Sequence, residues 1–205
     1  MRMDDGVTTF VDEIRGEVSF DHKFVMSSEN MAIKSLIRTV PNYPQQGIMF
    51  RDITTLLKNS SGLKLMLDEL LDRYRSMQID KVAGIEARGF IIAAPLAYLL
   101  GVGFVPIRKK GKLPSNTIGH DYDLEYGTDR IEIHTDAIKS GDKVLLVDDL
   151  IATGGTAEAA TYLIGQMEGK IVECAFVIDL PDLGGKKRLE NLGHSVFALT
   201  EFEGE

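Results

Sequence analysis

The sequence of 205 residues predicts an α/β fold, because short apolar segments typical of buried strands alternate with segments of helical spacing. Residues 144–147 are four consecutive apolar residues, and a glycine-containing turn separates them from apolar residues that recur at helical spacing between Ala157 and Met167. Residues 81–85 read as a second strand, before a helical pattern that runs through Leu100. The chain is 44% hydrophobic, which is ample for a packed core, and its length suits one domain, or one domain with an appendage.

The first half of the chain contains both helical spacing of apolar residues and short apolar runs. Apolar residues spaced three and four apart predict the helices, and short apolar runs predict the strands. In order, the expected elements are a helix over 31–40 capped by Ser28 or Asn30 and ended by Pro41, a short strand within 48–54, a helix over 60–76 capped by Ser60 or Ser61, a strand over 81–85, and a helix through Leu100.

The second half of the chain is richer in strands. The expected elements are a strand over 103–107, two strands within 117–136 around a turn at 126–129, the strand 144–147 with its helix, a strand over 170–179, a short helix over 183–192 and a last strand over 195–200. A run that holds four cations in five positions, residues 108–112, follows the first of these strands. The hairpin within 117–136 is a candidate lid.

Charge and cysteine usage limit the partners and the compartment. A net charge of −8 argues against nucleic-acid binding, so an anionic substrate must meet a local basic patch. The single cysteine, Cys174, lies in an apolar run and is expected to pack in a strand. With no stretch of 18 apolar residues and no secretory pattern, we expect a cytoplasmic protein without membrane contact. Residues 1–30 are expected to form a mobile extension, and residues 31–205 the domain.

The stretch 144–156 carries the strongest chemical signal. Two carboxylates, Asp148 and Asp149, end the strand, and the turn 152–156 (Ala-Thr-Gly-Gly-Thr) leads into a helix. Amides at a helix start bind anions, and residues without a Cβ let the chain approach a phosphate closely. The carboxylates suit ribose hydroxyls or a metal instead. The alternative is a buried strand with a capped helix and two solvated aspartates, but the full pattern favours a phosphorylated sugar.

The stretch 147–156 resembles the phosphoribosyl-pyrophosphate signature of type I phosphoribosyltransferases. The resemblance implies a parallel α/β sheet with flanking helices, a flexible lid hairpin at about 108–135 and a small N-terminal hood at about 31–55. It assigns the ribose 5-phosphate site to Asp148, Asp149, Ala152, Thr153, Gly154, Gly155 and Thr156.

Further stretches resemble motifs of this family, and the first of them is that of its adenine-specific members. The stretch 43–53 implies a base site at Met49, Phe50 and Arg51, in which Phe50 stacks on adenine, Arg51 contacts a ring nitrogen and Met49 offers backbone contacts. The stretch 84–90 resembles the pyrophosphate loop, with Ala87, Arg88 and a cis peptide between Glu86 and Ala87. The pyrophosphate clamp adds Arg108, Lys109 and Lys112, part of which is expected to reach a neighbouring subunit.

The lid supplies the last motif, Tyr-x-Leu-Glu-Tyr-Gly at 122–127. The resemblance makes Glu125 the group that handles the purine proton and gives Tyr126 a part in closing the hood. Glu125, Arg88 and Lys112 are therefore the expected catalytic residues. Without the resemblance, an exposed Glu125 on a hairpin would be the default reading.

The reaction implied is the conversion of adenine and phosphoribosyl pyrophosphate to AMP and pyrophosphate by a homodimer, with magnesium held mainly by substrate and water and no direct protein ligand. Two alternatives stay open, namely a transferase for another base, such as hypoxanthine or orotate, and a non-catalytic regulator that binds phosphoribosyl pyrophosphate. The sequence contains no G-x-x-x-x-G-K motif, and its Gly101–Gly103 pair lacks the rest of a dinucleotide fingerprint. ATP hydrolysis and nicotinamide redox chemistry are therefore disfavoured.

Overall fold

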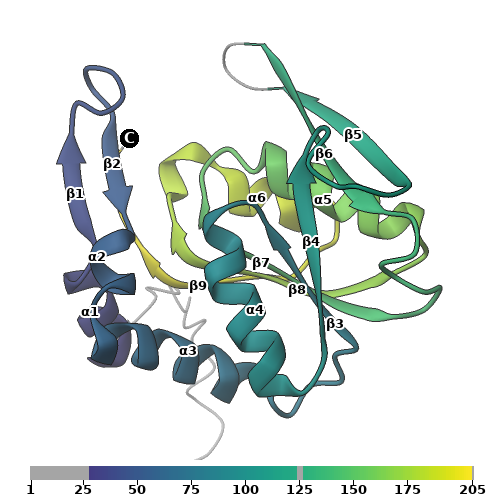
Figure 1. The fold of residues 1–205 in the computed structure, drawn as a ribbon. Coiled ribbons are helices and arrows are strands. Elements are labelled where there is room, and N and C mark those ends of the chain that lie inside the picture. The colour runs from purple at the N-terminus through teal and green to yellow at the C-terminus, as the bar shows by residue number, and fades with distance from the viewer. Residues whose placement is uncertain (1–27, 124–126, 205) are drawn as a thin grey trace, which may run out of the picture.

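The computed structural model describes residues 28–123 and 127–204, in which a seven-stranded sheet has the order β5-β6-β4-β3-β7-β8-β9 (Figure 1). Five of these strands run parallel, namely β3 (Lys81–Ile85), β4 (Gly103–Lys109), β7 (Lys143–Ile151), β8 (Lys170–Asp179) and β9 (Val196–Glu201). The hairpin of β5 (Thr117–Asp123) and β6 (Thr128–His134) continues the sheet in antiparallel fashion. The expected parallel α/β core is confirmed, with a mixed sheet once the hairpin is included.

Helices cover both faces of the sheet. The helices are α1 (Ser28–Ser35), α2 (Thr54–Leu57), α3 (Ser60–Tyr74), α4 (Arg88–Leu100), α5 (Gly155–Gln166) and α6 (Gly185–Asn191), and a 3-10 turn spans Pro181–Leu183. Figure 1 shows α3 and α4 on one side of the sheet and α5 and α6 on the other. The central strand β7 is apolar without alternation because Leu145 and Val147 enter the core under α3 and α4, while Val144 and Leu146 enter the core under α5.

The hood and the hairpin stand on opposite sides of the carboxyl ends of the parallel strands (Figure 1). The hood carries a separate two-stranded sheet of β1 (Arg38–Pro41) and β2 (Met49–Asp52), paired antiparallel. Ligands of open α/β sheets bind at the carboxyl ends of the strands. The two appendages therefore flank the place where the sequence puts its site residues.

The helix expected over 31–40 is wrong in its second half. The helix ends at Ser35, and residues 38–41 form β1, in which Val40 pairs with Phe50 and Thr39 with Arg51. The β-branched residues Thr39 and Val40 suit a strand, and the pairing with β2 is a long-range contact that helical spacing does not register. The α3 cap also differs, because the Asn59 side chain, not Ser60 or Ser61, accepts the amide of Gly62.

The predicted extension 1–30 lies outside the described residues except for residues 28–30, which begin α1. Cys174 is fully buried in β8, as expected, and burial raises the pKa of its thiol to about 12. Among the helices in the described ranges, none is both long and apolar enough to cross a membrane.

Candidate active site

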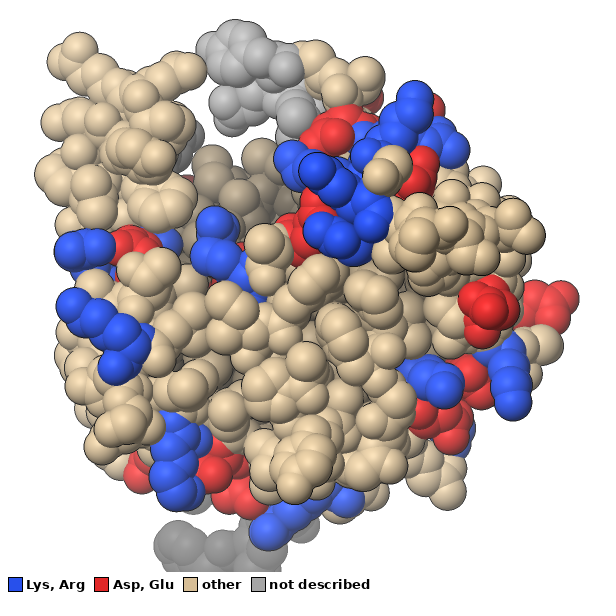
Figure 2. Space-filling model, in the orientation of Figure 1, with Lys and Arg blue, Asp and Glu red and all other residues tan. Residues whose placement is uncertain are grey.

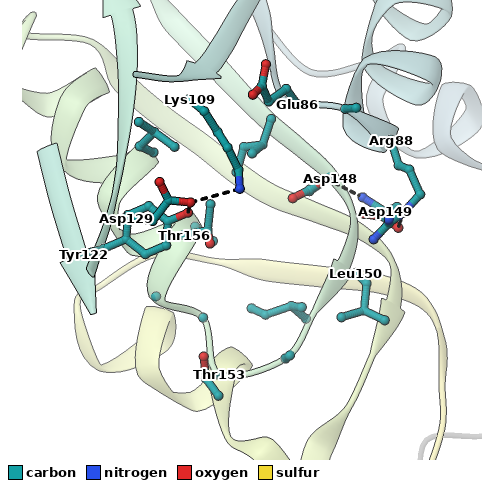
Figure 3. Close-up of a pocket in the computed structure, with 18 residues that line it drawn as sticks. Glu86, Arg88, Lys109, Tyr122, Asp129, Asp148, Asp149, Leu150, Thr153 and Thr156 are labelled. Carbon is teal, nitrogen blue, oxygen red and sulfur yellow. Dashed lines mark hydrogen bonds and ion pairs between the residues drawn. The ribbon is translucent and has the colours of Figure 1, made fainter. Parts of the chain in front are cut away.

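A cavity of about 360 Å³ opens where β3 and β7 end and α5 begins (Figure 3). It brings together residues from the pyrophosphate loop, the aspartate motif and the hairpin, which are distant in sequence. Its main polar lining residues are Glu86, Arg88, Lys109, Tyr122, Asp129, Asp148, Asp149, Thr153 and Thr156. Four further predicted residues, Ala87, Ala152, Gly154 and Gly155, also lie on its wall.

The phosphate loop, residues 152–156, is shaped by close backbone packing. Gly154 has a φ of +80°, and a Cβ there would lie 3.0 Å from the Cα of Gly185. Gly185 donates its amide to the carbonyl of Ala152 at 2.9 Å, and a Cβ on Gly185 would lie 2.2 Å from that oxygen. The first amides of α5 have no intrahelical acceptor. The loop is therefore a backbone cradle at a helix start, suited to an anion.

The acidic pair, Asp148 and Asp149, lines the same cavity from within β7, which does not end at these carboxylates as expected but continues to Ile151. Asp149 is 5% exposed and forms an ion pair with Arg88, and Figure 3 shows the two side chains directed toward one another. Asp148 accepts the amide of Asp149 at 2.8 Å. Desolvation, followed by the negative charge of Asp149, raises the pKa of Asp148 well above its usual range. Both carboxylates can accept hydrogen bonds from sugar hydroxyls.

The pyrophosphate loop has the expected cis peptide between Glu86 and Ala87. Arg88 follows it at the start of α4. Burial opposes the charged form of Arg88, but the hydrogen bond and charge of Asp149, with Asp148 and Asp52 nearby, raise its pKa overall. Arg88 therefore stays a cation at the mouth of the cavity.

The side chains of the basic run, residues 108–112, lie partly on the cavity wall and partly outside it. Lys109 lines the cavity and lies 3.0 Å from Asp129, an ion pair that raises the pKa of Lys109 and lowers that of Asp129. Arg108 is held by Glu86 at 2.6 Å and also donates to the carbonyl of Lys112 at 3.1 Å. The exposed Lys112 is not among the lining residues of this cavity. Figure 2 shows positive side chains gathered beside the hairpin.

A second cavity of about 320 Å³ lies in the hood and shares Arg88 with the first. Its wall includes Phe50 and Tyr43, whose rings meet edge to face with centroids 5.2 Å apart. A flat base can stack on an aromatic face of this kind. The cavity also contains Asp52, whose pKa falls to about 2 because Thr54 and Arg38 donate hydrogen bonds to its carboxylate.

Two predicted base-site residues lie outside the lining of this cavity. Met49 is 37% exposed. The Arg51 guanidinium points across β2 and donates to the hydroxyl of Thr39 at 2.6 Å and to the carbonyl of Glu203 at 3.0 Å. Glu125 and Tyr126 lie outside the described residues, so the proposed lid chemistry stays a prediction.

Sequence reasoning missed several residues that shape these cavities, among them Glu86, which pairs with Arg108, and four others. Tyr122 and Asp129 come from the two strands of the hairpin, and Tyr122 donates to Asp129 at 3.3 Å. Tyr43 and Asp52 line the hood cavity. All four stand inside or beside motifs that the sequence analysis singled out, so their position next to those motifs was the available signal. Gly185, which supports the phosphate loop, lies 30 residues away from it, and no local pattern points to that contact.

The chain is similar to known proteins over most of its length. The family model described as phosphoribosyl transferase domain matches residues 53–197. An adenine phosphoribosyltransferase of Nitrosospira multiformis is 71% identical over 174 residues, which is 85% of this chain and 99% of the relative.

Two solved structures are similar as well. The adenine phosphoribosyltransferase of Thermoanaerobacter pseudethanolicus is 44% identical, with a TM-score of 0.81 over 84% of this chain and 99% of that one. The Saccharomyces cerevisiae enzyme, complexed with an imino-altritol bisphosphate and adenine, is 39% identical with a TM-score of 0.79 over 84% and 99% of the two chains. The chain belongs to the phosphoribosyl transferase family and, within it, to the adenine phosphoribosyltransferases.

Proposed function

We propose that this chain transfers a phosphoribosyl group from phosphoribosyl pyrophosphate to adenine, giving AMP and pyrophosphate. The observation that carries the proposal is the junction of two cavities at Arg88, one with a backbone anion cradle and the other with an aromatic wall. A sugar phosphate and a base bound in these cavities would meet beside a fixed cation. The shared family and the high identity to named relatives support the same reaction.

The sugar phosphate binds in the first cavity. The amides of the phosphate loop and the hydroxyls of Thr153 and Thr156 hold the 5′-phosphate, while Asp148 and Asp149 accept hydrogen bonds from the ribose hydroxyls. Binding energy from the phosphate, which does not react, then positions the anomeric carbon. The nearby carboxylates also oppose the positive charge that the ribose ring develops as pyrophosphate departs.

Pyrophosphate leaves toward the loop at Ala87 and Arg88 and toward Lys109. To bind it, Arg88 exchanges its ion pair with Asp149 for the negative leaving group. Lys109 likewise exchanges its ion pair with Asp129 for the leaving pyrophosphate. Both cations are already desolvated in part, so once they leave their carboxylates they stabilise the charge that develops on the leaving group.

Magnesium fits this site as an ion carried by the pyrophosphate. Within residues 28–123 and 127–204, no group of three or more acidic, histidine or cysteine side chains forms a metal site. Magnesium keeps several waters and often binds through substrate phosphates, and Asp148 and Asp149 on the cavity wall would accept hydrogen bonds from such waters without binding the ion directly. When bound, it supplies positive charge to the departing pyrophosphate.

Adenine stacks on Phe50, with Met49 offering backbone contacts. The expected direct contact of Arg51 with a ring nitrogen is not part of the proposal, because Thr39 and Glu203 hold the guanidinium and Arg51 does not line the hood cavity. Glu125 takes the purine proton, and Tyr126 helps the lid to close over the base. A closed lid excludes water that would otherwise hydrolyse the activated sugar.

We further propose a homodimer that places part of the basic run in the partner's site. The outer face of α4 is apolar and exposed, with Ile91 at 46%, Leu99 at 43% and Tyr98 at 84%, and Figure 2 shows few charged side chains over it. An apolar stripe of this kind on a folded chain marks a contact surface. Lys112 lies outside its own chain's cavity, which suits a role across the interface.

We also propose a cytoplasmic location, and the support for it is the single, buried cysteine.

A pyrophosphate-release assay with adenine, hypoxanthine and guanine in parallel tests the proposed reaction. Adenine should support turnover with kcat/KM at least about 100-fold above the other two bases, because a site that hydrogen-bonds one base rejects another that leaves its polar groups unpaired. Equal turnover of hypoxanthine would favour a transferase for another base. Binding of phosphoribosyl pyrophosphate without turnover of any base would favour the non-catalytic regulator.

A further inference from the structure

Arg51 is a partly buried cation with an unusual set of partners. In the part of the chain that the structure describes, no carboxylate forms an ion pair with it, and its Nε is buried without a hydrogen-bond partner. Its guanidinium instead donates to Thr39 and to the Glu203 carbonyl, and lies 4.6 Å from the ring centroid of Phe202. The group thus gives up hydration for a cation–π contact and two hydrogen bonds to different elements.

The C-terminal segment, residues 202–204, is itself firmly attached to the main sheet. The Phe202 amide donates to the Asp179 carbonyl at the end of β8 at 3.0 Å, and the Gly204 amide donates to the Asp182 carboxylate at 2.7 Å. Lys34 of α1 lies 4.8 Å from the Phe202 centroid. This segment therefore connects the seven-stranded sheet to the hood.

The hood sheet needs such a connection. It has two strands of four residues each, and an isolated hairpin of that size is marginally stable. Successive side chains of a strand point to opposite faces, so Phe50 faces the hood cavity while Arg51 faces the C-terminal segment. A group that holds Arg51 on the face of β2 opposite to the hood cavity therefore also fixes the direction of the Phe50 ring.

We propose that Phe202, through Arg51, is a positioning residue for adenine binding: the C-terminal segment holds β2 so that Phe50 presents its ring to the base. The inference rests on the proposed binding of adenine against Phe50. An apolar contact alone would support β2 without fixing its rotation, whereas the planar guanidinium, with donors on two elements, defines one orientation. The segment thus acts on base binding without touching the base.

Steady-state kinetics of four variants test this inference. Phe202→Leu keeps apolar packing and removes the ring face, and Arg51→Met removes the guanidinium. Each should raise the KM for adenine about fivefold or more, the range expected for loss of a partly desolvated cation–π contact, and leave the KM for phosphoribosyl pyrophosphate within about twofold. The double variant should have an adenine KM no higher than that of Arg51→Met, because Phe202 is proposed to act on the base site only through Arg51, and its other cationic neighbour, Lys34, belongs to α1. Phe202→Tyr, which keeps the aromatic ring, should have the wild-type KM for adenine.

The control is Phe197→Leu, which alters a similar arginine–phenylalanine contact on β9, with Arg73 at 3.8 Å, without touching the hood. It should lower the melting temperature and leave both KM values unchanged. Equal rises of both KM values in Phe202→Leu, or an effect of Phe197→Leu on adenine as large as that of Phe202→Leu, would show general destabilisation and overturn the inference.

Phe50→Ala separates failure of the inference from failure of the proposed base site. A higher adenine KM in Phe50→Ala, together with an unchanged one in Phe202→Leu, would overturn the role of the C-terminal segment and leave the base site standing. An unchanged adenine KM in Phe50→Ala would show that adenine does not bind against Phe50. The inference would then be wrong as well.

Discussion

Neighbouring residues in the site have different surroundings, and this difference sets what each can do. Asp149 is paired with Arg88, whereas desolvation raises the pKa of Asp148. A substrate that brings its own anion can displace Asp149 from Arg88 and leave that carboxylate to a sugar hydroxyl. Arg88 and Lys109 are thus each paired with a carboxylate that a phosphorylated sugar can replace.

Glu125 is the residue whose role depends most on sequence resemblance. Glu125→Gln should lower kcat by about 100-fold or more, because a positioned proton acceptor contributes that much, and should change the KM for phosphoribosyl pyrophosphate little. Asp121→Asn, which alters an exposed pair with Arg130 on the same hairpin, is the matched control and should retain full turnover. Unchanged turnover in Glu125→Gln would assign the proton to another group.

Asp52 links the hood to the acid stability of the chain. Its folded-state pKa of about 2 lies below the ordinary value of 3.8, so its contribution is present above pH about 4 and is lost as the pH falls through about 2. Asp52→Asn should therefore lower the free energy of unfolding at pH 7 and flatten its decline between pH 4 and 2, measured by urea titration. Asp68→Asn, in an exposed helix pair with Lys64, should change neither by more than a few tenths of a kcal/mol.

At the scale of elements, the sequence predicts what local patterns determine. The strand over 81–85 matches β3 and the strand over 170–179 matches β8, because both are short apolar runs between clear turns. The phosphate loop is also predictable, because strand, carboxylates, glycines and helix are contiguous. In contrast, β1 forms because β2 pairs with it, and the direction of Arg51 depends on residues 202–204, so neither can be read from nearby residues.

The phosphate loop gives a prediction at this scale. Gly185→Ala would place a Cβ 2.2 Å from the Ala152 carbonyl and must displace the loop. We expect the KM for phosphoribosyl pyrophosphate to rise at least about tenfold, since each lost charge-assisted hydrogen bond costs roughly 1.5–3 kcal/mol, while the KM for adenine changes little. Gly165→Ala in α5, where a Cβ meets nothing within 4 Å, should keep both constants and gain up to about 1 kcal/mol of stability. An unchanged KM for phosphoribosyl pyrophosphate in Gly185→Ala would show that this loop does not bind the phosphate.

At the scale of the whole molecule, the apolar face of α4 predicts self-association. Tyr98→Glu puts a charge on the most exposed residue of that face and should convert the dimer to a monomer in light scattering. If the partner supplies Lys112, turnover should fall together with the dimer fraction. Tyr162→Glu, on the exposed side of α5, should remain dimeric. A wild-type chain that is monomeric at assay concentrations would exclude the shared site.

The most direct test of the whole account is a crystal structure of the chain with AMP. The 5′-phosphate should lie within hydrogen-bond distance of the amides of residues 153–156, the ribose hydroxyls on Asp148 and Asp149, and the adenine ring stacked on Phe50. AMP bound away from the phosphate loop, or with its base outside the hood cavity, would contradict it.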